Sequence, residues 1–306
     1  MVDFLFKLHQ TKLKMGMENN NKTLVAGSTG SLGLNVLRLL SEKGVPVRAL
    51  IRSEEERSKV APYTDDIWVG DASKGIEDIR NLTEGVSTVI SALGKSVSLF
   101  SPSEESFFET DYLANKAILD DAINNGVKRF VYVSIKGADV EKDYSIAKAH
   151  KMVENEVRAS GLEYTILRPV GFFSGLNDLA ILAKRKVIPV IGDGTAKTNS
   201  IHHKDLAEVV VSFHENGPDI IEVGGPLVHT RMEMAEMIKD KIGGQIVKIP
   251  ETMAKIGAAI PKIFDEGMHD KLDYFAFITT NDMIGEKHGS ISFNEYLSTL
   301  DLKELP

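Results

Sequence analysis

Three glycines at three-residue spacing, Gly27, Gly30 and Gly33, follow a short apolar run and open a helical pattern. In that context Gly27 permits a tight turn, Gly30 lets backbone N–H groups approach a ligand, and Gly33 lets helix and strand pack closely. The first N–H groups of a helix lack internal partners and carry the positive end of its dipole, so they stabilise an anion without a lysine. We therefore predict a dinucleotide diphosphate on this turn, contacted by Gly27, Ser28, Thr29, Gly30, Ser31, Leu32 and Gly33.

The residue after the second predicted strand indicates which dinucleotide binds. An acid there would bind the ribose 2′-hydroxyl of NAD, but this chain has Arg52, whose planar guanidinium suits the 2′-phosphate of NADP. Arg48 lies on the same face of the strand, further from the carboxyl end of the sheet. Asp71, after the third strand, can accept a hydrogen bond from the adenine amino group. NADP(H) is therefore the favoured cofactor, and NAD(H) is the alternative.

A parallel sheet is needed to position these residues. Short apolar runs predict strands, and helical patterns lie between most of them. Strands buried on both faces and joined by helices are typical of a doubly wound sheet, so we expect an α/β fold of the Rossmann type, with a mostly parallel sheet. The predicted strands are residues 22–26, 45–51, 67–69, 88–91, 130–134 and 164–167, and the first helix is residues 31–41.

We expect three parts along the chain: a flexible arm (1–20), a Rossmann domain (21–170) and a smaller α/β region that is mostly a substrate or partner cap (171–306). A predicted strand near 220–225 returns to the Rossmann sheet, so the cap is interleaved with it. The arm has too short an apolar stretch for a secretory signal. We expect a cytoplasmic protein, with organelle import through the arm as the alternative.

The composition excludes several classes of function. The 306 residues include 36 Lys and Arg against 44 Asp and Glu, and the net charge of −8 disfavours a nucleic-acid partner. The absence of cysteine excludes disulfides, thiolate catalysis and sulfur-ligated metals. No apolar run approaches the roughly 20 residues that cross a bilayer, so we expect no membrane insertion.

Other conspicuous residues have ordinary structural explanations. His202 and His203 are expected to stabilise a turn, because adjacent side chains rarely point to one metal centre, and no metal site is predicted. Asp205 is the expected cap of a helix that runs to Val211. A set of three methionines is expected to fill the core of the cap: Met232, Met234 and Met237.

Several longer motifs add to the glycine turn. They include residues 127–134 (VKRFVYVS), 160–169 (SGLEYTILRP), 171–174 (GFFS) and 223–226 (VGGP). From Thr23 onward the chain resembles the atypical short-chain dehydrogenase/reductases, in the branch of nitrogen-regulator-like and isoflavone-reductase-like NAD(P)H-binding proteins. This resemblance implies the fold and the cofactor, and it says little about the substrate.

The resemblance also implies catalytic residues. In that superfamily a tyrosine four residues before a lysine serves proton transfer, and Tyr144 and Lys148 match this spacing, with one helical turn placing them on one face. Lys148 would bind the nicotinamide ribose, and Ser134 would hydrogen-bond the substrate oxygen. His150 stands where many relatives that share the next motif have the lysine, so Lys148 and His150 are alternatives at the nicotinamide.

Two loops at the carboxyl edge of the sheet complete the predicted cofactor site. Phe172 and Phe173 either wall the substrate pocket or belong to the core. The remaining cofactor-binding residues follow the fourth and sixth strands: Ala92, Leu93, Gly94, Pro169, Val170 and Phe172.

Two functions are consistent with these residues. The first is an NADP(H)-dependent oxidoreductase that reduces a carbonyl or a conjugated double bond of a small, largely apolar substrate. The second is a non-catalytic redox sensor or assembly protein that binds the dinucleotide and holds a protein partner, or a second copy, through the cap. An open pocket beside Phe172 and Tyr144 would favour the enzyme. Sugar-nucleotide epimerisation is disfavoured, because the cap lacks an obvious basic cluster for a diphosphate.

Overall fold

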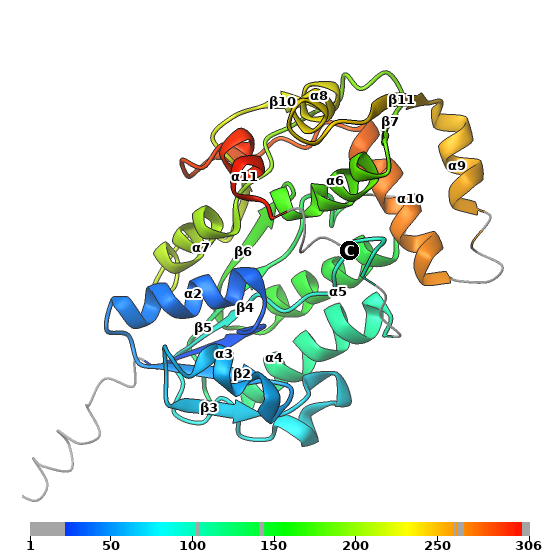
Figure 1. Ribbon diagram of the computed structural model, residues 1–306. Coiled ribbons are helices and arrows are strands. Elements are labelled where there is room, and N and C mark those ends of the chain that lie inside the picture. The colour runs from blue at the N-terminus through cyan, green and yellow to red at the C-terminus, as the bar shows by residue number, and fades with distance from the viewer. Residues whose placement is uncertain (1–21, 102–104, 141–143, 260, 262–265, 302–306) are drawn as a thin grey trace, which may run out of the picture.

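A computed structural model describes residues 22–101, 105–140, 144–259, 261 and 266–301, so the predicted arm lies outside the described residues (Figure 1). One sheet dominates it, and all its strand pairs are parallel. Its spatial order is β12 (Glu286–Lys287), β9 (Ile220–Gly224), β6 (Glu163–Pro169), β5 (Arg129–Val133), β4 (Thr88–Ser91), β1 (Thr23–Ala26), β2 (Val47–Ile51) and β3 (Asp66–Val69). This is the doubly wound Rossmann order extended by two strands, and it confirms the predicted fold class.

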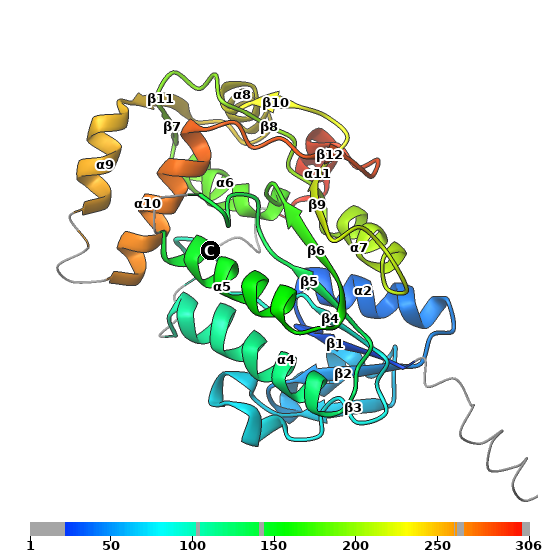
Figure 2. The ribbon, with the colours of Figure 1, turned by 180° about the vertical axis from the view of Figure 1, so that it is seen from behind.

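Helices cover both faces of the sheet, as the two views show (Figures 1 and 2). One face carries α2 (Ser31–Glu42) and α7 (His203–Ser212), and the other carries α4 (Ala114–Asn124) and α5 (Ser145–Ala159). The central strand β1 is buried on both faces, because Val25 packs into the core of the first face, and Leu24 and Ala26 pack into that of the second.

Short helical turns connect several of these elements, and one of the turns, η5 (Phe173–Leu176), belongs to the cap. Glu54 and Glu55 are exposed at the start of one of them, as expected for acids at a helix N-terminus. The turns and the one short helix are η1 (Glu54–Glu56), α3 (Arg57–Val60), η2 (Ala72–Lys74), η3 (Ile76–Ile79), η4 (Phe108–Leu113) and η5 (Phe173–Leu176).

The second half of the chain adds a cap beyond the carboxyl end of β6 (Figure 2). Its core contains Phe173, Met234 and Phe293, with Met232 and Met237 packed against it, so the methionine prediction is confirmed. Among the described residues, no helix is long and apolar enough to span a membrane. The elements of the cap are α6 (Asn177–Lys184), β7 (Val187–Ile191), β8 (Lys197–Thr198), β10 (His229–Thr230), α8 (Arg231–Ile242), β11 (Gln245–Ile249), α9 (Glu251–Ala259), α10 (Glu266–Thr280) and α11 (Phe293–Thr299).

Candidate functional site

The glycine turn lies between β1 and α2. Gly27 has a φ of +74°, and a β-carbon there would lie 2.7 Å from the carbonyl oxygen of Ala92. A β-carbon on Gly33 would lie 2.1 Å from the carbonyl oxygen of Gly27. Gly30 is exposed, has a φ of −76°, and a β-carbon there would find its nearest neighbour at 3.4 Å. Packing therefore requires glycine at positions 27 and 33, whereas Gly30 keeps the surface in front of the helix clear.

The N-terminus of α2 is open at this turn. Gly30 is its N-cap residue and has no side chain to cap it. The hydroxyl of Ser28 is fully buried and donates to the carbonyl oxygen of Leu50 at 2.6 Å, which fastens the turn to β2. Ser31 is exposed, and Leu32 is buried in the core. The turn thus presents backbone N–H groups and the positive end of a helix dipole to an anion.

Arg52 and Asp71 follow the neighbouring strands β2 and β3. Arg52 is exposed, and its Nη1 lies 3.3 Å from Oε1 of Glu105. Asp71 caps η2 by accepting a hydrogen bond from the backbone N–H of Ser73 at 3.1 Å. Burial raises the pKa of Asp71, but the Ser73 hydrogen bonds and the charge of Arg52 outweigh it, so the pKa lies below its ordinary value. The two predicted residues are close enough for their charges to interact.

Arg48 holds strands together instead. Its Nε donates to Oδ1 of Asp66 at 2.9 Å, and its Nη1 donates to the carbonyl oxygen of Leu82 at 2.6 Å. Its guanidinium also lies 5.4 Å from the ring centre of Trp68. Arg48 is therefore engaged in the packing of β2 against β3, and Arg52 is the arginine that faces solvent.

The loop after β4 borders the glycine turn. The N–H of Ala92 donates to the carbonyl oxygen of Ala26 at 3.0 Å. Leu93 is half-buried and Gly94 is exposed. Ala92 and Leu93 therefore lie against Gly27, at the carboxyl edge of the sheet, whereas Gly94 lies over Asp111.

Tyr144 does not lie on the helix that the four-residue spacing predicted. It is the N-cap of α5, with extended backbone (φ −78°, ψ 130°), and the helix begins at Ser145. Its ring packs against Tyr274 and Phe277 of α10, at centroid distances of 6.0 and 4.8 Å. Lys148 is exposed one turn into α5, and its backbone N–H donates to the carbonyl oxygen of Tyr144 at 2.8 Å. Tyr144 therefore precedes the helix instead of lying in its first turn, and Lys148 follows it by one turn.

Ser134 belongs to a buried group of charges. Its hydroxyl donates to Oε1 of Glu154 at 2.7 Å, and Ser134 is only 2% exposed. Arg168 donates to both oxygens of the same carboxylate, at 2.9 and 2.7 Å, and reaches Asp139 at 2.7 Å. Burial raises the pKa of Glu154, but hydrogen bonds from Arg168 and Ser134 outweigh it and hold that pKa below its usual value. The serine hydroxyl is therefore bonded to a carboxylate at the position where sequence reasoning expected a substrate oxygen.

His150 is a core residue. Its Nδ1 lies 2.6 Å from the hydroxyl of Tyr132 on β5, and the side chain is buried. Burial lowers the pKa of His150 to about 4, so the imidazole is neutral near pH 7. Of the two alternatives for the nicotinamide, the structure places Lys148 at the surface and His150 against the sheet.

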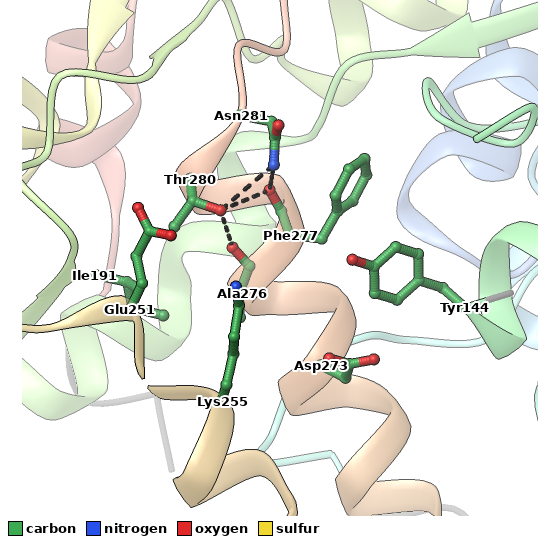
Figure 3. Close-up of a pocket in the computed structure, with 9 residues that line it drawn as sticks. All are labelled: Tyr144, Ile191, Glu251, Lys255, Asp273, Ala276, Phe277, Thr280 and Asn281. Carbon is green, nitrogen blue, oxygen red and sulfur yellow. Dashed lines mark hydrogen bonds between the residues drawn. The ribbon is translucent and has the colours of Figure 1, made fainter. Parts of the chain in front are cut away.

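A cavity of about 200 Å³ lies where α5 begins, between Tyr144 and the cap (Figure 3). Figure 3 shows the ring of Tyr144 facing α10, with its hydroxyl directed toward that helix. A second hollow of about 700 Å³ continues from it and shares part of its lining. The cavity is lined by Tyr144, Ile191, Glu251, Lys255, Asp273, Ala276, Phe277, Thr280 and Asn281. Its wall therefore mixes aromatic and polar groups.

The residues after β6 divide between surface and core. Phe173 is 3% exposed and packs on Phe293, at a centroid distance of 5.3 Å, in the core of the cap. Phe172 is half-buried and stacks on His203, with ring centroids 4.4 Å apart. Pro169 and Val170 are buried. Of the aromatic pair, only Phe172 remains a candidate wall of a ligand site.

The histidine pair acts in a turn. Nδ1 of His202 accepts a hydrogen bond from the backbone N–H of Lys204 at 3.1 Å, which makes His202 the N-cap of α7. The prediction that Asp205 caps this helix is wrong, because its carboxylate accepts from the N–H groups of Ser290 and Ile291 at 3.1 and 2.9 Å. In the described parts of the chain, no group of His, Asp and Glu side chains is arranged to bind a metal.

Sequence reasoning missed Asp111 and Asn115, which hold the loop after β4. Oδ1 of Asp111 accepts from the backbone N–H of Lys95 at 2.6 Å, and Nδ2 of Asn115 donates to the carbonyl oxygen of Leu93 at 3.3 Å. Both residues are fully buried. The available signal was an acid and an amide four residues apart in an otherwise apolar helical stretch.

The chain matches the family model described as NAD(P)H-binding over residues 27–216. A photosystem II assembly factor of Guillardia theta is 30% identical over 237 residues, which cover 74% of this chain and 73% of that protein. Subunit 9 of the mitochondrial NADH dehydrogenase [ubiquinone] 1 alpha subcomplex of Arabidopsis thaliana is 27% identical over 250 residues. That alignment covers 77% of this chain and 62% of the relative.

Among solved structures, the fold is similar to an NADPH-dependent quinone oxidoreductase from Escherichia coli in complex with NADPH. The TM-score is 0.71 at 20% identity, over 90% of this chain and 98% of the other. At that identity the likeness shows the shared fold.

Proposed function

The chain belongs to the NAD(P)H-binding family of atypical short-chain dehydrogenase/reductases, and we propose that it is an NADP(H)-dependent reductase of a small carbonyl or quinone-like substrate. The observation that carries the proposal is the glycine turn. A β-carbon at position 27 or 33 would clash with backbone atoms, and Gly30 leaves the surface in front of the helix clear. No side chain caps the N-terminus of α2. These features fit a dinucleotide diphosphate, which would be held by the backbone N–H groups at the start of α2.

Arg52 supports the choice of NADP(H). It is exposed at the end of β2, and its partner Glu105 is also partly exposed, so the pair is weakly held. A 2′-phosphate offers the guanidinium a stronger, bidentate partner than a single carboxylate oxygen at 3.3 Å. NAD(H) stays the alternative cofactor.

Tyr144 is the proposed proton donor. A reduced nicotinamide supplies hydride, and the reduced carbonyl oxygen then requires a proton. The support for this role is that Tyr144 lines the cavity at the start of α5, where a substrate oxygen would meet its hydroxyl. The ring of Phe277 offers an aromatic wall, and Thr280 and Asn281 offer polar groups. This mixed lining favours a planar molecule with polar oxygens over the largely apolar substrate expected from the sequence.

A second function is an assembly or regulatory role that uses the bound dinucleotide without turnover. It is favoured by the geometry of Ser134, whose hydroxyl is bonded to buried Glu154, and by the aromatic packing of Tyr144 on α10. Two relatives named above are a photosystem II assembly factor and a subunit of a mitochondrial NADH dehydrogenase, so a protein partner is part of this proposal. The mitochondrial name of one relative likewise makes organelle import an alternative to the cytoplasm.

Cofactor binding is tested with Gly30→Asp. Aspartate is a favourable N-cap residue, and the backbone of Gly30 is extended, so this variant should fold and melt like the wild type. Its carboxylate would occupy the place of the diphosphate, and the affinity for NADPH and NADH, measured by calorimetric titration, should fall at least 100-fold. Gly175→Asp, on an exposed glycine of the cap with open space around it, is the matched control and should bind normally. Equal affinity of Gly30→Asp and wild type would refute the site.

Turnover separates the two functions. We expect the wild type to oxidise NADPH in the presence of quinones or aromatic carbonyls, and Tyr144→Phe to lower kcat at least 100-fold with unchanged NADPH affinity. If no member of a broad substrate panel supports NADPH oxidation, the assembly role replaces the reductase.

A further inference from the structure

Asp111 is a fully buried carboxyl group in η4, beside the loop that follows β4. Its Oδ1 accepts a hydrogen bond from the N–H of Lys95 at 2.6 Å. Its Oδ2 is also buried and has no hydrogen-bond partner among the described residues. A buried carboxylate oxygen without a partner is costly, whereas a protonated oxygen avoids the cost of a buried charge. The geometry therefore favours the neutral acid.

A short series of contacts joins Asp111 to the glycine turn. A β-carbon on Gly94 would lie 3.3 Å from Oδ1 of Asp111, so the loop passes directly over the carboxyl group. Two residues earlier, the carbonyl oxygen of Ala92 lies against Gly27. The same loop therefore touches the carboxyl group of Asp111 at Gly94 and the glycine turn at Ala92, two residues apart.

The groups facing Asp111 do little to neutralise it. From the loop, Lys95 contributes the backbone N–H and a nearby positive charge. From β5, Tyr132 is near enough for its pKa to be raised by the charge of Asp111, after the larger effect of burial. The hydroxyl of Tyr132 is itself paired with Nδ1 of His150 on α5, at 2.6 Å. Burial raises the pKa of Asp111 to about 7, against the opposing effect of the Lys95 hydrogen bond and charge.

We infer that Asp111 is a positioning residue that couples a proton to occupancy of the dinucleotide site: the site binds the anionic diphosphate best when Asp111 is neutral. This inference rests on the proposed cofactor site. The physical reason is repulsion between like charges, because a carboxylate that is fully buried is screened by water less than an exposed one. Binding should raise the pKa of Asp111, so the complex takes up a proton near pH 7 and the affinity falls as pH rises.

The test is the pH dependence of NADH binding between pH 6 and 8.5. NADH is the probe because its diphosphate charge is constant in this range, whereas the 2′-phosphate of NADPH titrates near pH 6. The wild-type affinity should fall about tenfold across the range, which corresponds to about one unit of pKa change on binding. Asp111→Asn keeps an oxygen for the Lys95 N–H and cannot ionise, so its affinity should be flat and equal to that of the wild type at pH 6.

Glu109→Gln, an exposed acid on the same turn, is the control and should keep the wild-type slope. If Asp111→Asn does not fold, the wild type can be titrated with NADH in a calorimeter at pH 7, in buffers of different ionisation enthalpy. The dependence of the heat on the buffer should show that binding takes up a fraction of a proton. A pH-independent wild-type affinity, no proton uptake, or an unchanged slope in Asp111→Asn would overturn the inference and leave the cofactor site intact. Absence of binding at every pH would refute the cofactor site as well.

Discussion

At the scale of single residues, the three glycines of the turn have different physical roles. Gly33 is required because a β-carbon would meet the carbonyl oxygen of Gly27 at 2.1 Å, and backbone cannot move aside as a flexible side chain would. Gly30 meets nothing closer than 3.4 Å. Packing within the protein therefore does not require glycine at position 30. We infer that the ligand requires it, because a side chain there would stand in front of the helix.

This difference predicts the stability of two alanine variants. Gly33→Ala should lower the free energy of unfolding by about 3 kcal/mol, as overpacking does in other cores. Gly30→Ala should lower it by less than about 1 kcal/mol, because only the quality of the N-cap changes. Urea unfolding followed by the fluorescence of Trp68, the single tryptophan, measures both. Equal losses in the two variants would contradict the assignment.

The choice between cofactors is also a residue-scale property. Arg52→Ala should weaken NADPH binding about tenfold, the value of one charged hydrogen bond, and leave NADH binding unchanged. Glu105→Gln removes the carboxylate that competes for the guanidinium, so it should keep or strengthen NADPH binding. Competitive titration with both nucleotides gives the ratio of the NADPH and NADH affinities. If this ratio is unchanged in Arg52→Ala, another group binds the 2′-phosphate.

At the scale of elements, the loop after β4 connects the Rossmann sheet to the cap. Oδ2 of Asp178, in the first turn of α6, accepts from the N–H of Leu99 at 2.7 Å. From α10, Nζ of Lys271 donates to the carbonyl oxygens of Ser98 and Ser101, both at 2.8 Å. Two charged side chains from separate cap helices therefore determine where this loop lies over the carboxyl edge.

Hydrogen exchange of the Leu99 amide tests this connection. Asp178→Asn weakens a charge-assisted hydrogen bond, so the protection factor of Leu99 should fall about tenfold. Asp240→Asn, on the exposed face of α8, is the control and should leave the exchange rate unchanged. Unaltered protection in Asp178→Asn would mean that backbone contacts alone hold the loop.

At the scale of the whole molecule, buried titratable groups set the acid limit of stability. The pKa of His150 is lowered by burial to about 4, so between pH 6.5 and 4 the unfolded chain binds a proton that the folded chain does not. Stability is therefore lost as pH falls through this range. Asp111 acts in the opposite sense, because its folded pKa of about 7 exceeds that of the unfolded chain, so the folded state binds the extra proton.

Two variants should change this pH profile in opposite directions. His150→Asn keeps an acceptor for Tyr132. Between pH 6.5 and 4 its free energy of unfolding should fall by about 3 kcal/mol less than that of the wild type, since each pKa unit corresponds to about 1.36 kcal/mol. The free energy of unfolding of Asp111→Asn should fall by more than that of the wild type over the same range, because the variant lacks the group that gains a proton on folding. Urea unfolding at half-unit steps of pH measures the curves, and parallel curves for all three proteins would contradict both assignments. His229→Asn, on a half-exposed histidine, is the control.

The sequence by itself determined the features that depend on near neighbours. The glycine turn, the strand before it and the helix after it lie within about twenty residues, and burial of β1 on both faces already requires the parallel, helix-covered sheet. Tertiary structure alone decided the surroundings of the chemical groups. Tyr144 meets Phe277, Ser134 meets Glu154, and Asp205 meets Ile291, because packing brings distant segments together. Periodicity reports which face of an element is buried, and it carries no information about which distant side chain covers that face.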